Sequence, residues 1–374
     1  MLYVQRTWHN TEVNMGVYTT INDPSAHFQI ALYNGNNSTN TITNTGNSNL
    51  QPDWLWFKER SSTSSHHIFD TSRGVGGSGK ALYSDTNDAQ GNDTALTSVN
   101  TDGFTLASTN GFNQSGQTNV AWQWKANGGT TSIDTTGSSS AAGYDTTIQV
   151  NQTAGFSIVQ WGAAFDQGNG RYNLGHGLGK IPDFIAIKNV AASADWYVHH
   201  KDIDNNDYLR WNLNNGTSNA AARYTFYRPD FTTALFNVDY NNIVAQSQGY
   251  VAYVFAAIQG YSKFGRYTGN GQNDEGPFIY TGFKPRYVWF KRLDAAEEWY
   301  IYDSVRDPIN PIDRKIFIDN GAAESQSETL DFVSNGIKLR NSSSAFNADG
   351  ATYIYAAFAE SPFVSSAGVP TTAR

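Results

Sequence analysis

The stretch Pro182–Lys188, with the sequence PDFIAIK, is central to this chain because nearly the same seven residues occur twice more. Pro52–Lys58 is PDWLWFK and Pro285–Lys291 is PRYVWFK. Each copy has a proline, an Asp or Arg, an apolar and aromatic run, and a closing lysine. Proline suits the entry to a strand, and β-branched and aromatic side chains favour strands. The motif therefore predicts three strands, each entered from a turn and left into water at its lysine.

The three copies stay in register well beyond the motif. Trp196 and Trp299 both lie 14 residues after their proline, and a closing aromatic residue lies 72 or 73 residues after it, at Trp124, Phe255 and Phe358. The first and third copies also share three residues at equal distances from the proline: Asp70 and Asp303, Arg73 and Arg306, and Gly103 and Gly336. A repeat this long exceeds the roughly 50 residues of solenoid periods, so each copy is expected to be a domain.

Composition limits the possible classes of protein. A chain of 374 residues suits two to four domains, which agrees with three repeats. The net charge of −8 argues against sequence-independent binding to nucleic acid, because no basic field faces the phosphates. The chain has no Cys, which excludes disulfides, thiolate zinc sites and cysteine nucleophiles. Its 10 Trp, 21 Tyr and 21 Phe supply ample core material, and we expect no cofactor.

Neither a secretory signal nor a membrane span is expected. Met1–Arg6 lacks a basic start followed by an apolar core. The longest run of apolar character, Tyr250–Ile258, is too short to cross a bilayer. We therefore expect a soluble product made in a cytoplasm, without membrane insertion.

Short strands separated by Gly, Asn, Asp and Pro turns predict an all-β chain, because no segment shows helical spacing over ten residues. Even spacing of such strands favours three tandem antiparallel β-sandwiches of jelly-roll or concanavalin-like form. The expected organisation is an N-terminal arm, repeat 1, a Gly/Ser/Thr linker, repeat 2, repeat 3 and a C-terminal tail, at residues 1–24, 25–128, 129–152, 153–260, 261–364 and 365–374. The linker composition predicts that the first domain is separable, whereas the second and third move as one body.

The N-terminal arm allows three interpretations. It could lie on the first domain, dock to another protein or be a flexible terminus.

The segment Gly74–Ala81 nearly spells a phosphate-binding loop, with spaced glycines and Lys80. Such a loop needs a hydroxyl residue after the lysine and a helix whose amino end faces the phosphates. Ala81 has no hydroxyl, and the residues after it start no helix. A glycine-rich hairpin loop is therefore the favoured interpretation over nucleotide binding.

Two histidine pairs, His66–His67 and His199–His200, raise the question of a metal site. Adjacent residues in a strand point to opposite faces, so neither pair can chelate one ion within a strand. Isolated surface or cross-strand histidines are favoured, and no metal site is expected.

The shared Asp and Arg residues allow a catalytic and a structural interpretation. Asp70 with Arg73, or Asp303 with Arg306, could act in a glycosidase, but that chemistry needs two carboxyl groups roughly 5 to 9.5 Å apart. The second repeat has His200 at the aspartate position, so the fold does not require the pair. A structural ion pair that closes a loop is favoured, and no Gly-x-Ser-x-Gly elbow is present.

Aromatic residues without counterparts in the other repeats are the remaining candidates for ligand contact. Exposed Tyr and Trp side chains stack on sugar faces or anchor protein interfaces. We expect any receptor site in the second repeat, at Tyr208, Trp211, Tyr224, Tyr227 and Tyr240.

The third repeat resembles a repeat of virion proteins from tailed bacteriophages. The resemblance lies in Thr281–Pro285 (TGFKP), Trp299–Asp303 (WYIYD) and Tyr353–Phe363 (YIYAAFAESPF). His176–Pro182 (HGLGKIP) is similar in the second repeat, and Phe69–Gly74 (FDTSRG) in the first. The first repeat departs most, with His66 where the others have tryptophan. The domain form also resembles lectin-like and SPRY-like sandwiches.

The resemblance implies a non-enzymatic structural protein of the virion, assembled in the host cytoplasm and exposed on the phage particle. A tail-fibre or tail-appendage component that attaches to a host glycan or protein receptor is the leading expectation. A capsid decoration or scaffold protein that docks through its arm is the first alternative, and a polysaccharide-depolymerising tailspike is the second. By analogy, we expect other virion proteins as partners and a homotrimer.

Overall fold

The computed structural model describes residues 17–76, 80–107, 111–136, 143–162, 171–205, 207–219, 226–239 and 249–371. Their regular structure is strand throughout, apart from the short 3-10 helices η1 (Pro24–Ala26) and η2 (Arg228–Asp230). The all-β prediction is confirmed. In this part of the chain, no helix is long and apolar enough to span a membrane.

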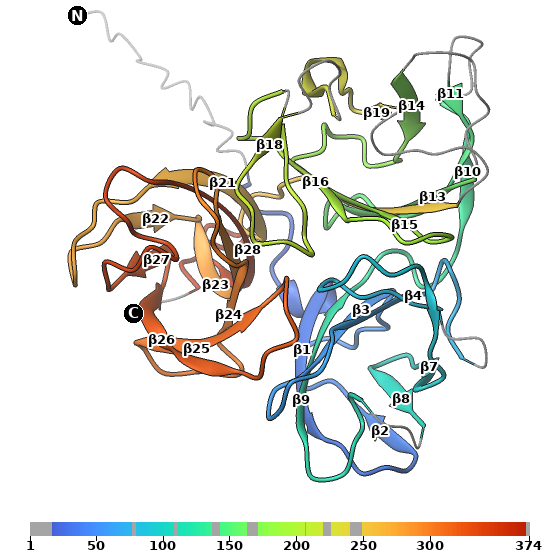
Figure 1. Cartoon of the computed structure of the whole chain (residues 1–374), viewed down its shortest axis with the longest axis horizontal. Helices are drawn as coiled ribbons and strands as arrows, with labels where there is room; N and C mark the ends of the chain where they lie inside the picture. Colours follow the sequence, from blue (N-terminus) through green and yellow to red (C-terminus); the bar gives the residue numbers. More distant parts are fainter. Residues whose placement is uncertain are drawn as a thin grey trace, which may run out of the picture.

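Each repeat forms a unit with the same four-stranded inner sheet, in which neighbouring strands run antiparallel (Figure 1). In unit 1 the strand order is β1 (Phe28–Asn34), β9 (Thr118–Trp124), β3 (Trp54–Glu59) and β4 (His67–Asp70). In unit 2 it is β13 (Phe156–Trp161), β20 (Tyr250–Phe255), β15 (Phe184–Asn189) and β16 (Tyr197–His200). In unit 3 it is β21 (Ser262–Thr268), β28 (Thr352–Pro362), β23 (Phe283–Arg292) and β24 (Tyr300–Asp303).

A second layer of strands covers the outer face of each inner sheet. Unit 1 has β2 (Asn40–Ile42), β8 (Phe104–Leu106) and β7 (Leu96–Val99), with the small hairpin of β5 (Lys80–Ala81) and β6 (Gly91–Asn92). Unit 2 has β11 (Gly143–Tyr144), β14 (Arg171–Gly175) and β19 (Leu235–Asp239), with the pair β17 (Asp207–Tyr208) and β18 (Ser218–Asn219). Unit 3 continues from β24 through β25 (Ile312–Phe317), β26 (Ser325–Val333), β27 (Gly336–Leu339) and β22 (Phe278–Tyr280). Each unit therefore has a sandwich core of its own.

The described parts of the segment predicted as a linker, residues 129–136 and 143–152, belong to unit 2, and residues 137–142 lie outside the described chain. The described parts contain β10 (Ser132–Asp134) and β12 (Thr146–Asn151), which extend the inner sheet in the order β10-β12-β13. The pairing of β12 with β13 runs from Thr147↔Gln160 to Asn151↔Phe156. The linker prediction is wrong for these residues because small polar side chains also suit the exposed edge strand β10, and Ile148 of β12 packs into the core of unit 2.

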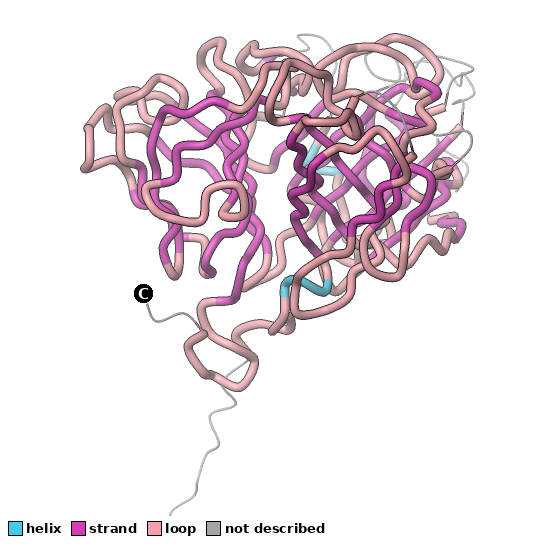
Figure 2. Tube along the Cα trace, turned by 90° about the horizontal axis from the view of Figure 1, so that it is seen from below, coloured by secondary structure: helices cyan, strands magenta, loops and turns pink. Residues whose placement is uncertain are grey.

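The three inner sheets face one another across one shared aromatic core (Figures 1 and 2). Trp54, Phe184 and Tyr287 occupy the same repeat position in β3, β15 and β23, and all three are buried in this core. The motif strands can pack against both the shared core and the core of their own unit because both of their faces are apolar. In β3, Trp54 and Trp56 face the shared core, whereas Leu55 and Phe57 face the core of unit 1.

The closing aromatics of the three repeats meet at the centre of the molecule. Ring centroids lie 6.5 Å apart for Trp124 and Phe255, 5.6 Å for Phe255 and Phe358, and 5.6 Å for Trp124 and Phe358. These side chains form a triangle with one corner from each unit. The expectation of a separable first domain is therefore wrong, because separation would expose this core to water.

The described end of the arm lies against units 2 and 3. Ile21 is buried in the shared core, the Tyr18 hydroxyl donates to the Gly282 carbonyl at 2.6 Å, and Thr19 Oγ1 donates to the Gln259 carbonyl at 2.9 Å. The backbone N–H of Ser366, in the predicted tail, donates to Asn22 Oδ1 at 2.7 Å. Residues 1–16 and 372–374 lie outside the described part of the chain.

Candidate functional site

Repeated polar side chains join the units into a closed ring. Trp196 Nε1 of unit 2 donates to the Tyr83 carbonyl of unit 1 at 2.7 Å. Trp299 Nε1 of unit 3 donates to the Arg210 carbonyl of unit 2 at 3.0 Å. In unit 1 the same repeat position holds His66, whose Nε2 lies 2.6 Å from the Phe317 carbonyl of unit 3. His66 thus replaces the tryptophan of the other repeats and still contacts the neighbouring unit.

The predicted ion pairs are confirmed, and both are completely buried. Arg73 Nε lies 2.5 Å from Asp70 Oδ2, and Arg306 Nε lies 2.5 Å from Asp303 Oδ2. Each aspartate is 0 % exposed and also accepts the backbone N–H of its arginine at 2.8 Å. Burial alone would lower the pKa of each arginine, but the paired aspartate raises it.

Each Asp–Arg pair also contacts the next unit. The Tyr253 hydroxyl of unit 2 donates to Asp70 Oδ2 at 2.8 Å, and Trp122 Nε1 of unit 1 donates to Asp303 Oδ2 at 3.0 Å. A glycosidase carboxyl must reach its substrate, whereas these carboxylates are enclosed between units. Their geometry stabilises the ring.

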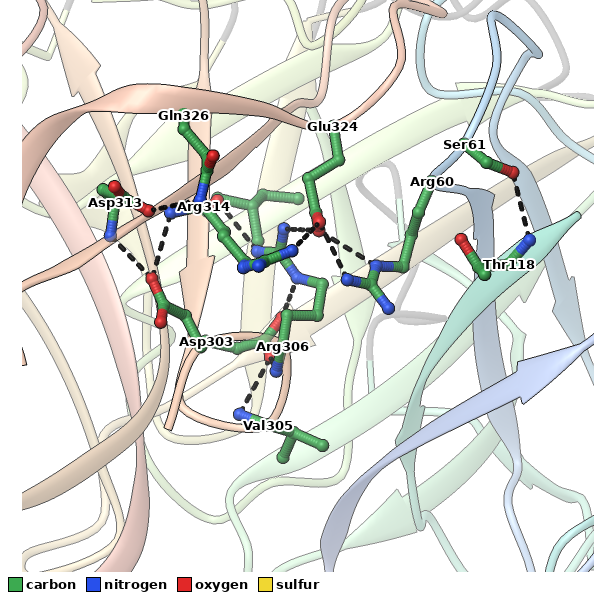
Figure 3. A network of polar contacts seen from close by, with 12 residues as sticks. Arg60, Ser61, Thr118, Asp303, Val305, Arg306, Asp313, Arg314, Glu324 and Gln326 are labelled. Atoms are coloured by element: carbon green, nitrogen blue, oxygen red, sulfur yellow. Dashed lines mark hydrogen bonds and ion pairs between the residues drawn. The ribbon is translucent and has the colours of Figure 1, made fainter. Parts of the chain in front are cut away.

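A third carboxylate joins the first unit to the last (Figure 3). Glu324 Oε1 lies 2.8 Å from Arg60 Nη2 of unit 1, and Glu324 Oε2 lies 2.9 Å from Arg306 Nη1. Arg314 approaches the same carboxylate at 3.3 Å. Burial alone would raise the pKa of Glu324, but hydrogen bonds and charge from Arg60 and Arg306 lower it to about 2.

The closing lysines of the motif are buried, contrary to the prediction that they reach water. Lys58, Lys188 and Lys291 are each 0 % exposed, and burial lowers the pKa of each to about 8. Backbone carbonyls accept from all three ammonium groups. Two of these carbonyls belong to the preceding unit: Lys188 donates to Asn87 at 3.1 Å, and Lys291 to Asn214 at 2.8 Å. The repeated lysine therefore also connects units.

The histidines fill structural positions. Trp56 Nε1 donates to His66 Nδ1 at 2.8 Å, and His200 Nε2 lies 3.3 Å from the Tyr355 carbonyl. Burial lowers the pKa of His66 and His199 well below the ordinary value, and that of His200 to about 3. Across the described residues, no group of three or more His, Cys, Asp or Glu side chains could hold a metal ion.

The glycine-rich segment near residue 74 ends in a strand and not in a helix. Lys80 and Ala81 form β5, which pairs with β6, and Leu82 bridges Ile68. Residues 77–79 of this segment lie outside the described part of the chain.

The predicted receptor residues are not brought together on one surface. Trp211 is only 1 % exposed, and its ring lies 5.2 Å from that of Trp56 in the shared core. Tyr208 is half-buried against Tyr197, with ring centroids 5.3 Å apart. Tyr227 is half-buried beside η2. Tyr224 and Tyr240 lie outside the described residues.

Two cavities open at the end of the molecule where the described chain begins and ends. The first, of about 590 Å³, lies in unit 3 and is lined by Lys284, Ser304, Pro308, Ile309, Asn310, Ile312, Phe332, Val333, Ser334 and Thr371. The second, of about 390 Å³, lies between the arm and unit 2, with Val17–Thr20 and Lys180 in its wall. Neither cavity is predictable from the sequence, because the lining residues come from distant segments without a common pattern.

Comparison with protein families matches residues 23–362 to a family described as a domain of unknown function, DUF7483. The chain belongs to the DUF7483 family. The match extends through all three units and residues 129–152, so a DUF7483 domain corresponds here to the whole ring and not to one sandwich. No curated protein and no solved structure matches the chain.

Proposed function

We propose that this DUF7483 protein is a non-enzymatic structural component of a tailed-bacteriophage particle, in a tail fibre or tail appendage that attaches to the host surface. The observation that carries the structural role is the closed ring. The repeated Asp, Arg, Lys and Trp side chains join neighbouring units, and the paired aspartates Asp70 and Asp303 are fully buried. The phage assignment rests on the resemblance of the repeats to virion proteins.

The composition of the chain supports a role in attachment. Only 16 % of its residues are charged, so contacts at its surface depend little on salt. Several copies on one particle would make weak contacts effective, because each bound copy raises the local concentration of the others.

Labelling the protein on intact particles tests the proposal. Antibodies against the purified chain, viewed by electron microscopy, should mark the tail fibre or appendage of the phage that encodes it. The purified protein should also bind host cells. Absence of label from particles would overturn the virion role, whereas labelled tails without cell binding would remove only the attachment role.

The capsid-decoration alternative is supported by the anchoring of the arm. Tyr18 and Thr19 hold its described end on the body, which would give the preceding residues a fixed point of departure toward another virion protein. Deletion of residues 1–16 tests this alternative and leaves Ile21 in the core. Loss of incorporation into particles with intact host binding would favour docking through the arm.

The depolymerising tailspike is tested with the unmodified protein. We expect no release of reducing sugar from host polysaccharide, because Asp70 and Asp303 are enclosed between units.

A further inference from the structure

The cavity of about 590 Å³ in unit 3 has the size of a ligand site, since such sites range from roughly 300 to 1,000 Å³. Its apolar residues include Ile312 and Phe332, which are 1 % and 4 % exposed, and Ile309, which is 76 % exposed. Its polar side includes Lys284, whose Nζ lies 2.7 Å from Glu360 Oε1. Ser304 Oγ donates to the other oxygen of Glu360 at 3.3 Å.

Units 1 and 2 use the corresponding end of the inner sheet for the chain that leads to the next unit. Asp53 Oδ2 accepts the backbone N–H groups of Ala126 at 2.7 Å and Gly128 at 3.0 Å, and Asp183 Oδ2 accepts that of Ala257 at 2.7 Å. These aspartates directly follow the motif proline, and they hold the chain close to the sheet as it leaves the last inner strand.

Unit 3 differs from units 1 and 2 at this end of the inner sheet. Arg286 takes the place of the aspartate, and β23 and β28 continue to the pairs Phe283↔Pro362 and Lys284↔Ser361. The repeat positions of Lys284 and Glu360 are Gln51 and Ala126 in unit 1, and Ile181 and Ala257 in unit 2. The Lys284–Glu360 pair is thus particular to unit 3.

Hydrogen bonds hold the loop that forms one wall of the cavity. The side chain of Asn310 donates to the Phe332 carbonyl at 2.9 Å and accepts the Phe332 N–H at 3.0 Å. Asp307 Oδ2 accepts the Asp313 N–H at 2.8 Å, and the Ser304 N–H donates to the Arg286 carbonyl at 2.9 Å. A ligand would therefore meet a preformed surface, which lowers the entropic cost of binding.

We propose that this cavity binds one or two neutral sugar residues of a host-surface glycan. This assignment rests on the attachment role proposed above and specifies the ligand. Lys284 and Glu360 offset each other's charge, so the polar side attracts neither an anion nor a cation strongly. The Ser304 hydroxyl accepts from sugar hydroxyl groups, and the Lys284 ammonium group donates to them. Ile309, which is 76 % exposed, supplies the main apolar surface for the C–H face of a sugar ring, beside the buried Ile312 and Phe332.

Two substitutions in the cavity and one matched control test the proposal in the full chain. Lys284→Gln removes the charged donor of the polar side, and Ile309→Asp places a charge on the apolar rim. Ile133→Asp is the control, because Ile133 is 61 % exposed on β10 of unit 2, away from the cavity. All three changes are at exposed or half-exposed positions, and unchanged thermal unfolding checks that each variant folds.

Binding is measured on an array of neutral and acidic oligosaccharides and then by calorimetry with the best neutral ligand. We expect the unmodified chain and Ile133→Asp to bind alike, and each cavity variant to bind at least about tenfold more weakly. Preference for acidic glycans, absence of glycan binding, or unchanged binding by the cavity variants would overturn the assignment.

Binding to host cells is measured in parallel. Cell binding that survives both cavity substitutions leaves the attachment role standing and removes the cavity from it, whereas glycan binding without cell binding removes the attachment role alone.

Discussion

The interface between units 2 and 3 lacks the buried aspartate that the other two interfaces contain. Asp70 of unit 1 faces the Tyr253 hydroxyl, and Asp303 of unit 3 faces Trp122 Nε1. At the remaining interface the aspartate is replaced by His200, and the repeat position of Trp122 and Tyr253 is Ala356, which has no donor. At these three interfaces, the carboxylate is present where the neighbour supplies a hydrogen-bond donor.

The comparison shows what a buried carboxylate requires in this fold. Burying a charge without partners is costly, and the arginine of the same unit satisfies only part of the carboxylate. His200 needs no such arrangement, because burial lowers its pKa to about 3 and leaves the ring neutral at pH 7. A single sandwich can therefore fold without the Asp–Arg pair. The pair is present where the neighbouring unit supplies a hydrogen-bond donor to the aspartate.

Removing one aspartate should have the largest effect. We expect Asp70→Asn to destabilise the chain by about 3–5 kcal/mol, because it leaves Arg73 buried without a carboxylate partner. Asp303→Asn should fall at the lower end of that range, since Arg306 keeps Glu324 at 2.9 Å. Urea unfolding of both full-length variants measures the difference, and a smaller loss for Asp70→Asn than for Asp303→Asn would contradict it.

Restoring the repeat residue in unit 1 should have a smaller but still unfavourable effect. His66→Trp inserts a larger side chain into a filled space and removes the acceptor of Trp56 Nε1, so we expect a loss of about 1–3 kcal/mol. Thermal unfolding checks this, with the unmodified chain as reference. A gain in stability would mean that the ring tolerates tryptophan equally at all three interfaces.

The buried lysines predict a stability that rises with pH. In the unfolded chain a lysine keeps its proton up to a pKa near 10.4, whereas Lys58, Lys188 and Lys291 lose theirs from about pH 8 in the folded chain. The unfolded state then binds more protons, so stability should increase between pH 8 and 10, by up to about 1.4 kcal/mol per pH unit for each lysine. Lys188→Met should reduce the slope in urea unfolding measured over this range. Identical slopes would show that Lys188 stays charged when folded.

The smallest effect is expected for the ion pair between Lys284 and Glu360 beside the cavity of unit 3. The side chains of Lys284 and Glu360 are 30 % and 28 % exposed, and such pairs contribute about 0–1 kcal/mol. Lys284→Gln should therefore change the free energy of unfolding by less than about 1 kcal/mol, and added salt should reduce the difference. A loss comparable to that of Asp303→Asn would place this pair among the contacts that hold the ring.

The repeat and the all-β class were predictable because they depend on local patterns. The proline-led motif forms β3, β15 and β23, and the equal spacing of Trp196 and Trp299 reflects the same contact with a preceding unit. The Asp–Arg pairs were also predicted as ion pairs from their shared spacing. That each aspartate faces a neighbouring unit could not be read from one repeat alone.

The shared core was missed although the sequence carries a signal for it. A strand of a free-standing sandwich alternates apolar and polar residues, whereas the motif strands are apolar on both faces. Trp54 and Trp56 alternate with Leu55 and Phe57, so both faces of β3 must pack against other apolar side chains. Trp211 has no counterpart in the other repeats, which favours a surface position, yet its side chain packs in the shared core. The cavity in unit 3 was not predictable, because it depends on where the chain goes after β28.

Closure of the ring between the first and last units has a consequence for synthesis. A ribosome releases unit 1 first, yet the partners of Arg60, His66 and Trp122 lie at Glu324, Phe317 and Asp303. While the last third of the chain is being translated, the aromatic side chains of units 1 and 2 that pack against unit 3 are still exposed to water. The contacts between units 1 and 3 can form only after unit 3 has been synthesised, and we expect the growing chain to need most protection from aggregation before then.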